Sequence, residues 1–190
     1  ICDVHPYHGW VIGYDANSLA QVSVANTSPN GQAAGIWQSA AGIAGDTSGN
    51  VYVETSNGLF NVDQGGSEYG NTVLKLNNGT IADYFTPFNA TALTEVDSDM
   101  SSAGPMLLPD QTVGPPHLMI ASGKEGVIYL LNRDAMGHFR STDDNQIVQS
   151  IDILGGCADE GSLWGLQAYW QNNLYVWACG DVMRQFRLYQ

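Results

Sequence analysis

The residues best suited to metal binding lie near the start of the chain. Asp3, His5 and His8 place one carboxylate and two imidazoles in a short segment, and borderline transition metals prefer such ligands. The alternative is a loop that hydrogen-bonds its own histidines, which we favour because motifs this loose often occur without a metal. Asp3, His5 and His8 are therefore a candidate metal site and no more.

Two other segments carry polar groups at spacings that chemistry could use. Residues 46–50 (DTSGN) have the oxygen spacing of a loose calcium loop but lack the acidic end of the EF-hand pattern. We expect them to form a hairpin turn without an ion. Residues 155–162 place paired acids beside Cys157 and Ser162, but no adjacent histidine could activate a nucleophile. We favour a loop for this segment also.

The cysteines have neither the spacing of a zinc site nor a Cys-x-x-Cys pair. Cys157 and Cys179 flank a predicted strand pair and could form a disulfide, which would indicate an oxidising compartment. Two small buried thiols are the alternative, because sequence does not fix their distance. Cys2 would be left over in either case. A charged-residue content of only 13% resembles that of exported bacterial proteins, so the predicted location is periplasmic or secreted.

The overall charge narrows the range of partners. The 190 residues include 19 acidic and 6 basic side chains, for a net charge of −13. Phosphate backbones are bound by Lys and Arg, so this balance argues against a nucleic-acid partner. No apolar run reaches the length of about 18 residues that a membrane-spanning helix needs, and we predict no membrane span.

The elements that would position these residues are predicted to be strands. Short apolar runs rich in β-branched and aromatic residues alternate with turns rich in Gly, Asn and Asp. Strands made mainly of small residues are expected at residues 35–44 and 102–108. The clearest example is a hairpin in which strands 118–122 and 127–131 flank a Gly-Lys-Glu-Gly turn, whose Lys124 and Glu125 we expect to be solvated. We expect no amphipathic helix, and residues 92–100 could at most form a short turn.

Similar strands recur along the chain, and this recurrence predicts the architecture. The order of strands and turns repeats from near residues 51, 118 and 174, which favours a β-propeller of four-stranded antiparallel blades over a β-sandwich. Three to four blades would be present, as an incomplete ring, over residues 1–30, 31–90, 101–155 and 156–190. Since an open arc exposes sheet faces, we expect further blades from the same protein or from another chain.

Four strings carry a resemblance to a known family: residues 7–16 (YHGWVIGYDA), 45–53 (GDTSGNVYV), 123–134 (GKEGVIYLLNRD) and 168–175 (AYWQNNLY). They resemble the blade repeats of the quinoprotein-like (pyrroloquinoline quinone repeat) β-propellers, over nearly the whole chain. The resemblance implies the scaffold more than an activity. It also implies that the tryptophans pack between blades, namely Trp10, Trp37, Trp164, Trp170 and Trp177.

Active members of that family bind pyrroloquinoline quinone with a calcium-type ion, using carboxylate and amide ligands, an adjacent Cys-Cys disulfide and a stacking Trp. This sequence has no Cys-Cys pair, and no local motif selects a general base among Asp83, Asp97, Asp99 and Asp159. We therefore expect a non-catalytic extracytoplasmic module used for binding or assembly. The alternatives are part of a quinone-dependent alcohol or sugar dehydrogenase, and a carbohydrate-binding or cell-surface module.

Overall fold

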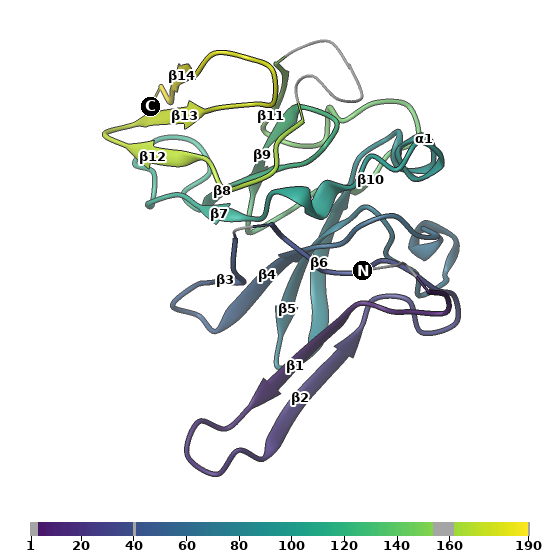
Figure 1. The fold of residues 1–190 in the computed structure, drawn as a ribbon. Coiled ribbons are helices and arrows are strands. Elements are labelled where there is room, and N and C mark those ends of the chain that lie inside the picture. The colour runs from purple at the N-terminus through teal and green to yellow at the C-terminus, as the bar shows by residue number, and fades with distance from the viewer. Residues whose placement is uncertain (1–3, 40, 154–161, 190) are drawn as a thin grey trace.

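The protein is described by a computed structural model that covers residues 4–39, 41–153 and 162–189. The described chain is mostly β-strand, which confirms the predicted all-β class, and its strands form four sheets (Figure 1). The first sheet is the hairpin of β1 (Trp10–Tyr14) and β2 (Gln21–Asn26). The last is the three-stranded sheet of β12 (Ala168–Trp170), β13 (Asn173–Val176) and β14 (Arg184–Arg187).

The two middle sheets are antiparallel meanders. The second sheet contains β3 (Ala44–Gly45), β4 (Asn50–Glu54), β5 (Val73–Asn77) and β6 (Thr80–Thr86), and β10 (His138–Phe139) joins its edge in parallel with β6. The third contains β7 (Met106–Leu107), β8 (Leu118–Ser122), β9 (Val127–Asn132) and β11 (Gln149–Asp152). Within the described residues, none of the four sheets closes on itself.

The sheets stack face to face in chain order. Because successive side chains of a strand point to opposite faces, an inner sheet can contribute to the apolar layers on both of its sides. Three apolar layers result. The first and second sheets enclose Ala25, Val53, Leu74 and Leu76. The second and third enclose Tyr52, Val73, Phe85, Met119 and Leu131. The third and fourth enclose Ile120, Ile128, Leu130, Leu174 and Val176.

The helical segments are short and lie between strands. They are η1 (Val62–Gln64), α1 (Ala90–Glu95) and η2 (Met100–Ser102). The expectation of at most a turn near residue 92 was wrong, since α1 buries Ala90 and Leu93. No helix in the described part of the chain has the length and apolar character needed to cross a membrane.

Each of the four predicted repeat ranges contains one sheet. The exception is β10, which lies in the range 101–155 but pairs with β6 of the second sheet. The predicted strands on the first edge of the second and third sheets are much shorter than expected, since β3 and β7 have two residues each. Residues 35–44 were expected to be a strand, but only β3 forms at their end. Gln38 has a positive φ of 34° there, and its side-chain oxygen accepts a hydrogen bond from the Glu54 backbone N–H at 3.0 Å. A side chain thus takes the place of strand pairing at this position.

The hairpin between β8 and β9 differs from the prediction at its tip. Gly126 has φ 78°, as the tight turn requires, and a Cβ on Gly123 would lie 2.4 Å from the carbonyl oxygen of Asp99. The tip therefore packs closely on the segment around residue 99. Lys124 and Glu125 are half-buried and bound to neighbouring side chains, which corrects the prediction that they are solvated: Lys124 binds Asp99, and Glu125 accepts a hydrogen bond from the Tyr129 hydroxyl.

The expected role of the tryptophans was also wrong within the described structure. All five are 42% to 74% exposed, and the layers between sheets contain Tyr52, Phe85 and Tyr129 instead. Trp10, Trp170 and Trp177 lie on outer surfaces of the stack, while Trp37 and Trp164 contact each other with ring centroids 5.8 Å apart.

Candidate functional site

The predicted metal site is described only in part. Asp3 lies outside the described residues, so the site stays a prediction. The Nδ1 atom of His8 lies 2.7 Å from the Ser28 carbonyl oxygen, and the His5 ring stacks on Tyr7 with centroids 5.0 Å apart. No group of three His, Cys, Asp or Glu side chains is arranged to hold a metal among the residues that the structure covers.

The cysteine predictions fall mostly on undescribed residues. Cys2, Cys157 and nearly all of segment 155–162 lie outside the described ranges, so the Cys157–Cys179 disulfide stays a prediction. Cys179 is exposed and lies in a hollow beside the last sheet.

The turn at residues 46–50 forms as expected. The Asp46 carboxylate accepts hydrogen bonds from the backbone N–H groups of Ser48 and Asn50, both at 2.9 Å, and from the Tyr52 hydroxyl at 3.0 Å. Burial by itself would raise the pKa of Asp46, but the hydrogen bonds from Asn50, Tyr52 and Ser48 outweigh it and lower that pKa to about 2. The carboxylate is thus fully used by its own turn.

The structure separates the aspartates that the sequence could not distinguish. Asp97 and Asp99 lie together against Lys124, with Nζ–Oδ2 distances of 3.2 and 2.5 Å. Asp83 lies elsewhere, 3.1 Å from the His138 ring. Asp159 is outside the described residues.

Lys124 is the centre of the most developed site, which we call the lysine pocket. Its Nζ lies 5.5 Å from the ring centroid of Trp37 and 5.4 Å from that of Trp164, and the two rings are 5.8 Å apart. Asp99 also accepts a hydrogen bond from the Asn57 backbone N–H at 3.0 Å. The site joins segments that are far apart in sequence, because Trp37 precedes β3, Lys124 lies in the β8–β9 turn and Trp164 precedes β12.

The electrostatics of the pocket keep Lys124 charged. Partial burial by itself would lower its pKa, but the hydrogen bonds and charges of Asp99 and Asp97 outweigh burial and raise that pKa. The ammonium therefore has no unprotonated form at neutral pH that could act as a base or nucleophile. One lysine against two aspartates leaves the cluster with an excess of negative charge.

An open cavity of about 600 Å³ adjoins this cluster. Its lining combines an exposed indole face with carboxylate, amide, hydroxyl and ammonium groups, supplied by Trp37, Asp97, Asp99, Asn57, Tyr7, Ser56 and Lys124. A flat apolar surface beside several hydrogen-bonding groups is the usual make-up of a small-molecule site.

The lysine pocket does not fit the calcium ion that the family resemblance implies. Both oxygens of Asp99 are already used, one by the Asn57 N–H and the other by the Lys124 ammonium. Calcium needs about 6–8 oxygen ligands, and the described acids and histidines form no such group. The ammonium is itself the cation between these two carboxylates.

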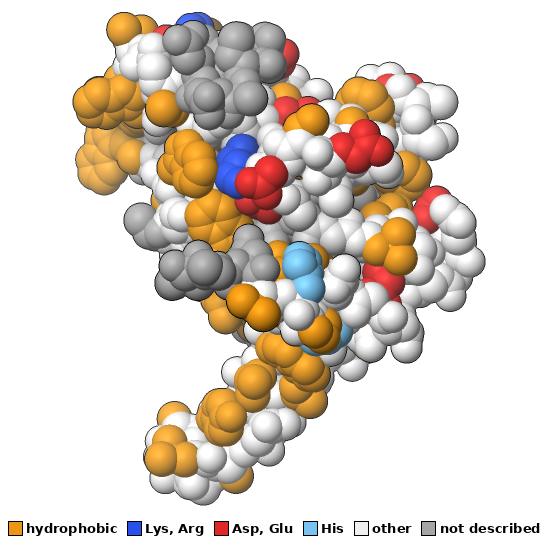
Figure 2. All heavy atoms as spheres, turned by 45° about the vertical axis from the view of Figure 1, so that its right-hand side comes forward, with side chains coloured by type: hydrophobic (Ala, Val, Ile, Leu, Met, Phe, Trp, Pro, Cys, Tyr) orange, Lys and Arg blue, Asp and Glu red, His pale blue; other side chains and the backbone are white. Residues whose placement is uncertain are grey.

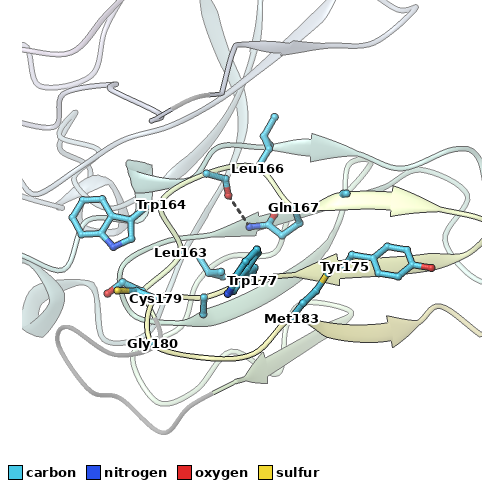
Figure 3. Close-up of a pocket in the computed structure, with 13 residues that line it drawn as sticks. Leu163, Trp164, Leu166, Gln167, Tyr175, Trp177, Cys179, Gly180 and Met183 are labelled. Atoms are coloured by element: carbon cyan, nitrogen blue, oxygen red, sulfur yellow. Dashed lines mark hydrogen bonds between the residues drawn. The ribbon is translucent and has the colours of Figure 1, made fainter.

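A second hollow lies on the outer face of the last sheet (Figure 3). It has a volume of about 530 Å³ and is mainly apolar, with Trp164, Leu166, Tyr175, Trp177 and Met183 in its lining. The side chain of Gln167 donates a hydrogen bond to the Gly165 carbonyl oxygen at 3.3 Å, as the dashed line shows. Trp164 borders both this hollow and the lysine pocket.

Comparison of the chain with protein-family models finds no match, and neither does comparison with curated proteins. The geometry of the site must therefore carry the functional argument.

Sequence reasoning missed the lysine pocket as a whole. It considered Asp97 and Asp99 only as possible bases, and placed Lys124 in solvent. The usable signal was the Lys-Glu pair within a turn of an otherwise uncharged hairpin, residues 118–131, in a chain with only 6 basic residues. A scarce cation in the turn of an uncharged hairpin indicates that an acidic partner lies nearby.

Proposed function

We propose that this chain is a non-catalytic, extracytoplasmic module of the quinoprotein-like β-propeller type, and that it binds a neutral polyhydroxylated ring, such as a carbohydrate, in the lysine pocket. The observation that carries the ligand assignment is the position of Lys124 between Asp99 and the two indoles of Trp37 and Trp164. Carbohydrate binding, which the sequence left as an alternative function, is here the binding function proposed for the scaffold.

The arrangement of the sheets supports the scaffold part of this proposal. Four sheets follow one another along the chain, each mainly antiparallel, and consecutive sheets share an apolar layer. Propeller blades have this relation to one another. Further blades, in the same protein or in another chain, would complete the ring.

The chemistry of the pocket supports the ligand class. The C–H face of a sugar ring can lie on an exposed indole, while neighbouring hydroxyls donate to a carboxylate and accept from an amide or ammonium group. Asp97 and Trp37 are exposed enough to meet such a ligand. The excess negative charge beside Lys124 disfavours anionic ligands, because like charges at close range repel.

The test is a glycan array probed with the purified chain, followed by calorimetry on any sugar that binds. Trp37→Ala removes the indole platform and should weaken binding at least about 10-fold, which corresponds to about 1.4 kcal/mol. Trp170→Ala is the matched control, since Trp170 is also exposed but lies on the last sheet outside the pocket lining. An array without binding, or equal losses in both variants, would contradict the proposal.

The dehydrogenase alternative rests on the family resemblance. The lysine pocket offers an indole and a cation to a planar quinone, but the carboxylates are occupied by Lys124, and pyrroloquinoline quinone is itself a polyanion. Reconstitution with the quinone and calcium separates the two functions. We expect no dye-linked activity, and activity together with a quinone absorbance band would establish the dehydrogenase function instead.

A further inference from the structure

The outermost faces of the two end sheets have the character of faces that pack against another sheet. On the first sheet, the side chains that point away from the stack form what we call the hairpin face: Trp10, Ile12, Tyr14, Val22 and Val24. They alternate with Val11 and Ala25, which face the second sheet. Ile12 and Val24 lie directly opposite each other across the two strands.

The hairpin face is exposed over a large part of the molecule. Figure 2 shows apolar side chains gathered along the hairpin, which projects from the body of the protein. Monomeric proteins rarely expose contiguous apolar surface of this kind unless it binds a partner.

The last sheet presents a corresponding face at the other end of the stack. We call it the terminal face: Ala168, Trp170, Tyr175, Trp177 and Met183. These residues alternate with Tyr169, Leu174 and Val176, which pack toward the third sheet. Ala168 and Tyr175 are cross-strand partners, and the apolar hollow of Figure 3 lies over them.

The charges of the two end sheets permit close approach. Neither β1 and β2 nor β12 to β14 contains an acidic residue, although the chain has 19 of them. The charged residues on these strands are Arg184, which pairs with Asp181, and Arg187. Two copies of a chain with net charge −13 could therefore meet through these faces with little like-charge repulsion.

The order of the stack selects which faces would meet. Every sheet has one face directed toward the sheet before it in the chain and one directed toward the sheet after it. In each inner interface, the second kind of face on one sheet packs on the first kind of face on the next sheet. The terminal face is the face of the last sheet that points away from the third sheet, and the hairpin face is the face of the first sheet that points away from the second. A contact between them continues the relation that already holds three times within the chain.

We propose that the hairpin face of one copy of this chain packs on the terminal face of a second copy. The protruding aromatics Trp10 and Tyr14 would then meet the hollow beside Trp177 and Met183. Such a head-to-tail contact leaves one free face on each partner, so that further copies add until a ring closes. This inference rests on the sheet stacking that the proposed function uses, and it is independent of the ligand in the lysine pocket.

The experiment is sedimentation velocity of the purified chain over a range of concentrations, where we expect the mass to rise with concentration. Ile12→Glu disables the hairpin face and Trp177→Glu disables the terminal face, so each variant alone should be monomeric. An equal mixture should form a 1:1 heterodimer and nothing larger, because each variant keeps the face that the other lacks. Val113→Glu, at an exposed apolar residue outside both faces, should associate like the unaltered chain.

Three results would overturn the proposal: an unaltered chain that stays monomeric at every concentration, a single variant that still associates, and a mixture that forms no heterodimer. The first would show that another sheet or protein covers these faces, and the second that like faces pair. Ile12→Thr and Trp177→Ser replace the glutamate variants if those do not fold. Sugar binding measured on the monomeric variants tests the lysine pocket separately, so either idea can fail alone.

Discussion

The inner interfaces of the stack and its two outer faces follow the same alternating pattern but differ in their aromatic residues. The inner layer between the second and third sheets uses Tyr52, Phe85 and Tyr129, with Phe85 and Tyr129 ring centroids 5.1 Å apart. The outer faces carry the exposed tryptophans Trp10, Trp170 and Trp177 beside Tyr14 and Tyr175, whereas the inner layer contains no tryptophan among its described residues. An alternating pattern of side chains along a strand therefore identifies a face that packs against a partner, but it does not show whether that partner lies in the same chain.

The largest effect that separates the two regions is expected at Phe85. Phe85→Ala should lower the free energy of unfolding by about 3–5 kcal/mol, because it removes a fully buried ring from a closed layer. Urea denaturation gives the change. Phe88→Ala, at an exposed ring three residues further on, should stay within about 0.5 kcal/mol. Equal losses would contradict the assignment of Phe85 to an inner interface.

The next effect is expected where the β8–β9 turn meets the lysine pocket. Lys124→Met should lower the free energy of unfolding by about 2–3 kcal/mol, since it leaves Asp99, whose side chain is 8% exposed, without its cation. The double variant Lys124→Met, Asp99→Asn should recover part of that loss, because it removes the unpaired charge. Urea denaturation of these proteins and of Asp99→Asn alone measures the coupling between the two side chains. A single variant as stable as the unaltered chain would contradict a structural role for this ion pair.

A smaller, pH-dependent effect is expected from Glu54, a polar exception in the inner stack. Burial raises the pKa of Glu54 well above its ordinary value of 4.5, which the backbone amides of Ser122 and Gly104 only partly oppose. The folded state therefore binds a proton more tightly than the unfolded state. The contribution of Glu54 to stability is therefore fully present below pH 4.5 and falls by about 1.4 kcal/mol per pH unit above it, until the folded-state pKa of Glu54 is reached.

Glu54→Gln should remove this part of the pH dependence, because the amide does not titrate. Thermal unfolding between pH 4 and 8 should show the variant gaining on the unaltered chain as pH rises. Glu95→Gln, at an exposed position on α1, is the control and should leave the slope unchanged. A slope that persists in Glu54→Gln would show that another group causes it.

The smallest effect on stability is expected on the terminal face. Trp177→Ser should change the free energy of unfolding of the monomer by no more than about 0.5 kcal/mol, because the indole is already exposed. Its effect should appear instead in self-association, as a mass that no longer rises with concentration. A loss of stability comparable to that of Phe85→Ala would mean that the outer faces contribute to the core.

The sequence predicted the strands well where both neighbours are strands. Strand β8, which pairs with β7 and β9, has the predicted bounds, and residues 46–50 form the predicted turn. Prediction failed at the short edge strands, where Gln38 replaces strand pairing with a side-chain hydrogen bond. It failed also at α1, whose six residues are too few to show a helical period.

The candidate site was much less predictable than the fold. Asp99 and Lys124 are 25 positions apart, and the two indoles of the lysine pocket come from Trp37 and Trp164. The charged turn marks Lys124 as unusual for its hairpin, but no local pattern identifies the residues that it contacts. Of the candidate residues found from local spacing, Asp3 and Cys157 fall outside the described residues. The metal site and the disulfide that include them therefore stay predictions.

The sequence by itself determined the all-β class, the alternation of the strands and the excess of acidic charge, because these depend on residue type and short-range spacing. Only the tertiary structure decided that Lys124 is an ion-paired group at the centre of a pocket, and that Trp10, Trp170 and Trp177 lie on outer faces. Alternation is symmetric between the two sides of a strand, so it cannot say which side meets a neighbour. That choice, and the meeting of distant segments at one lysine, arise only when the sheets stack.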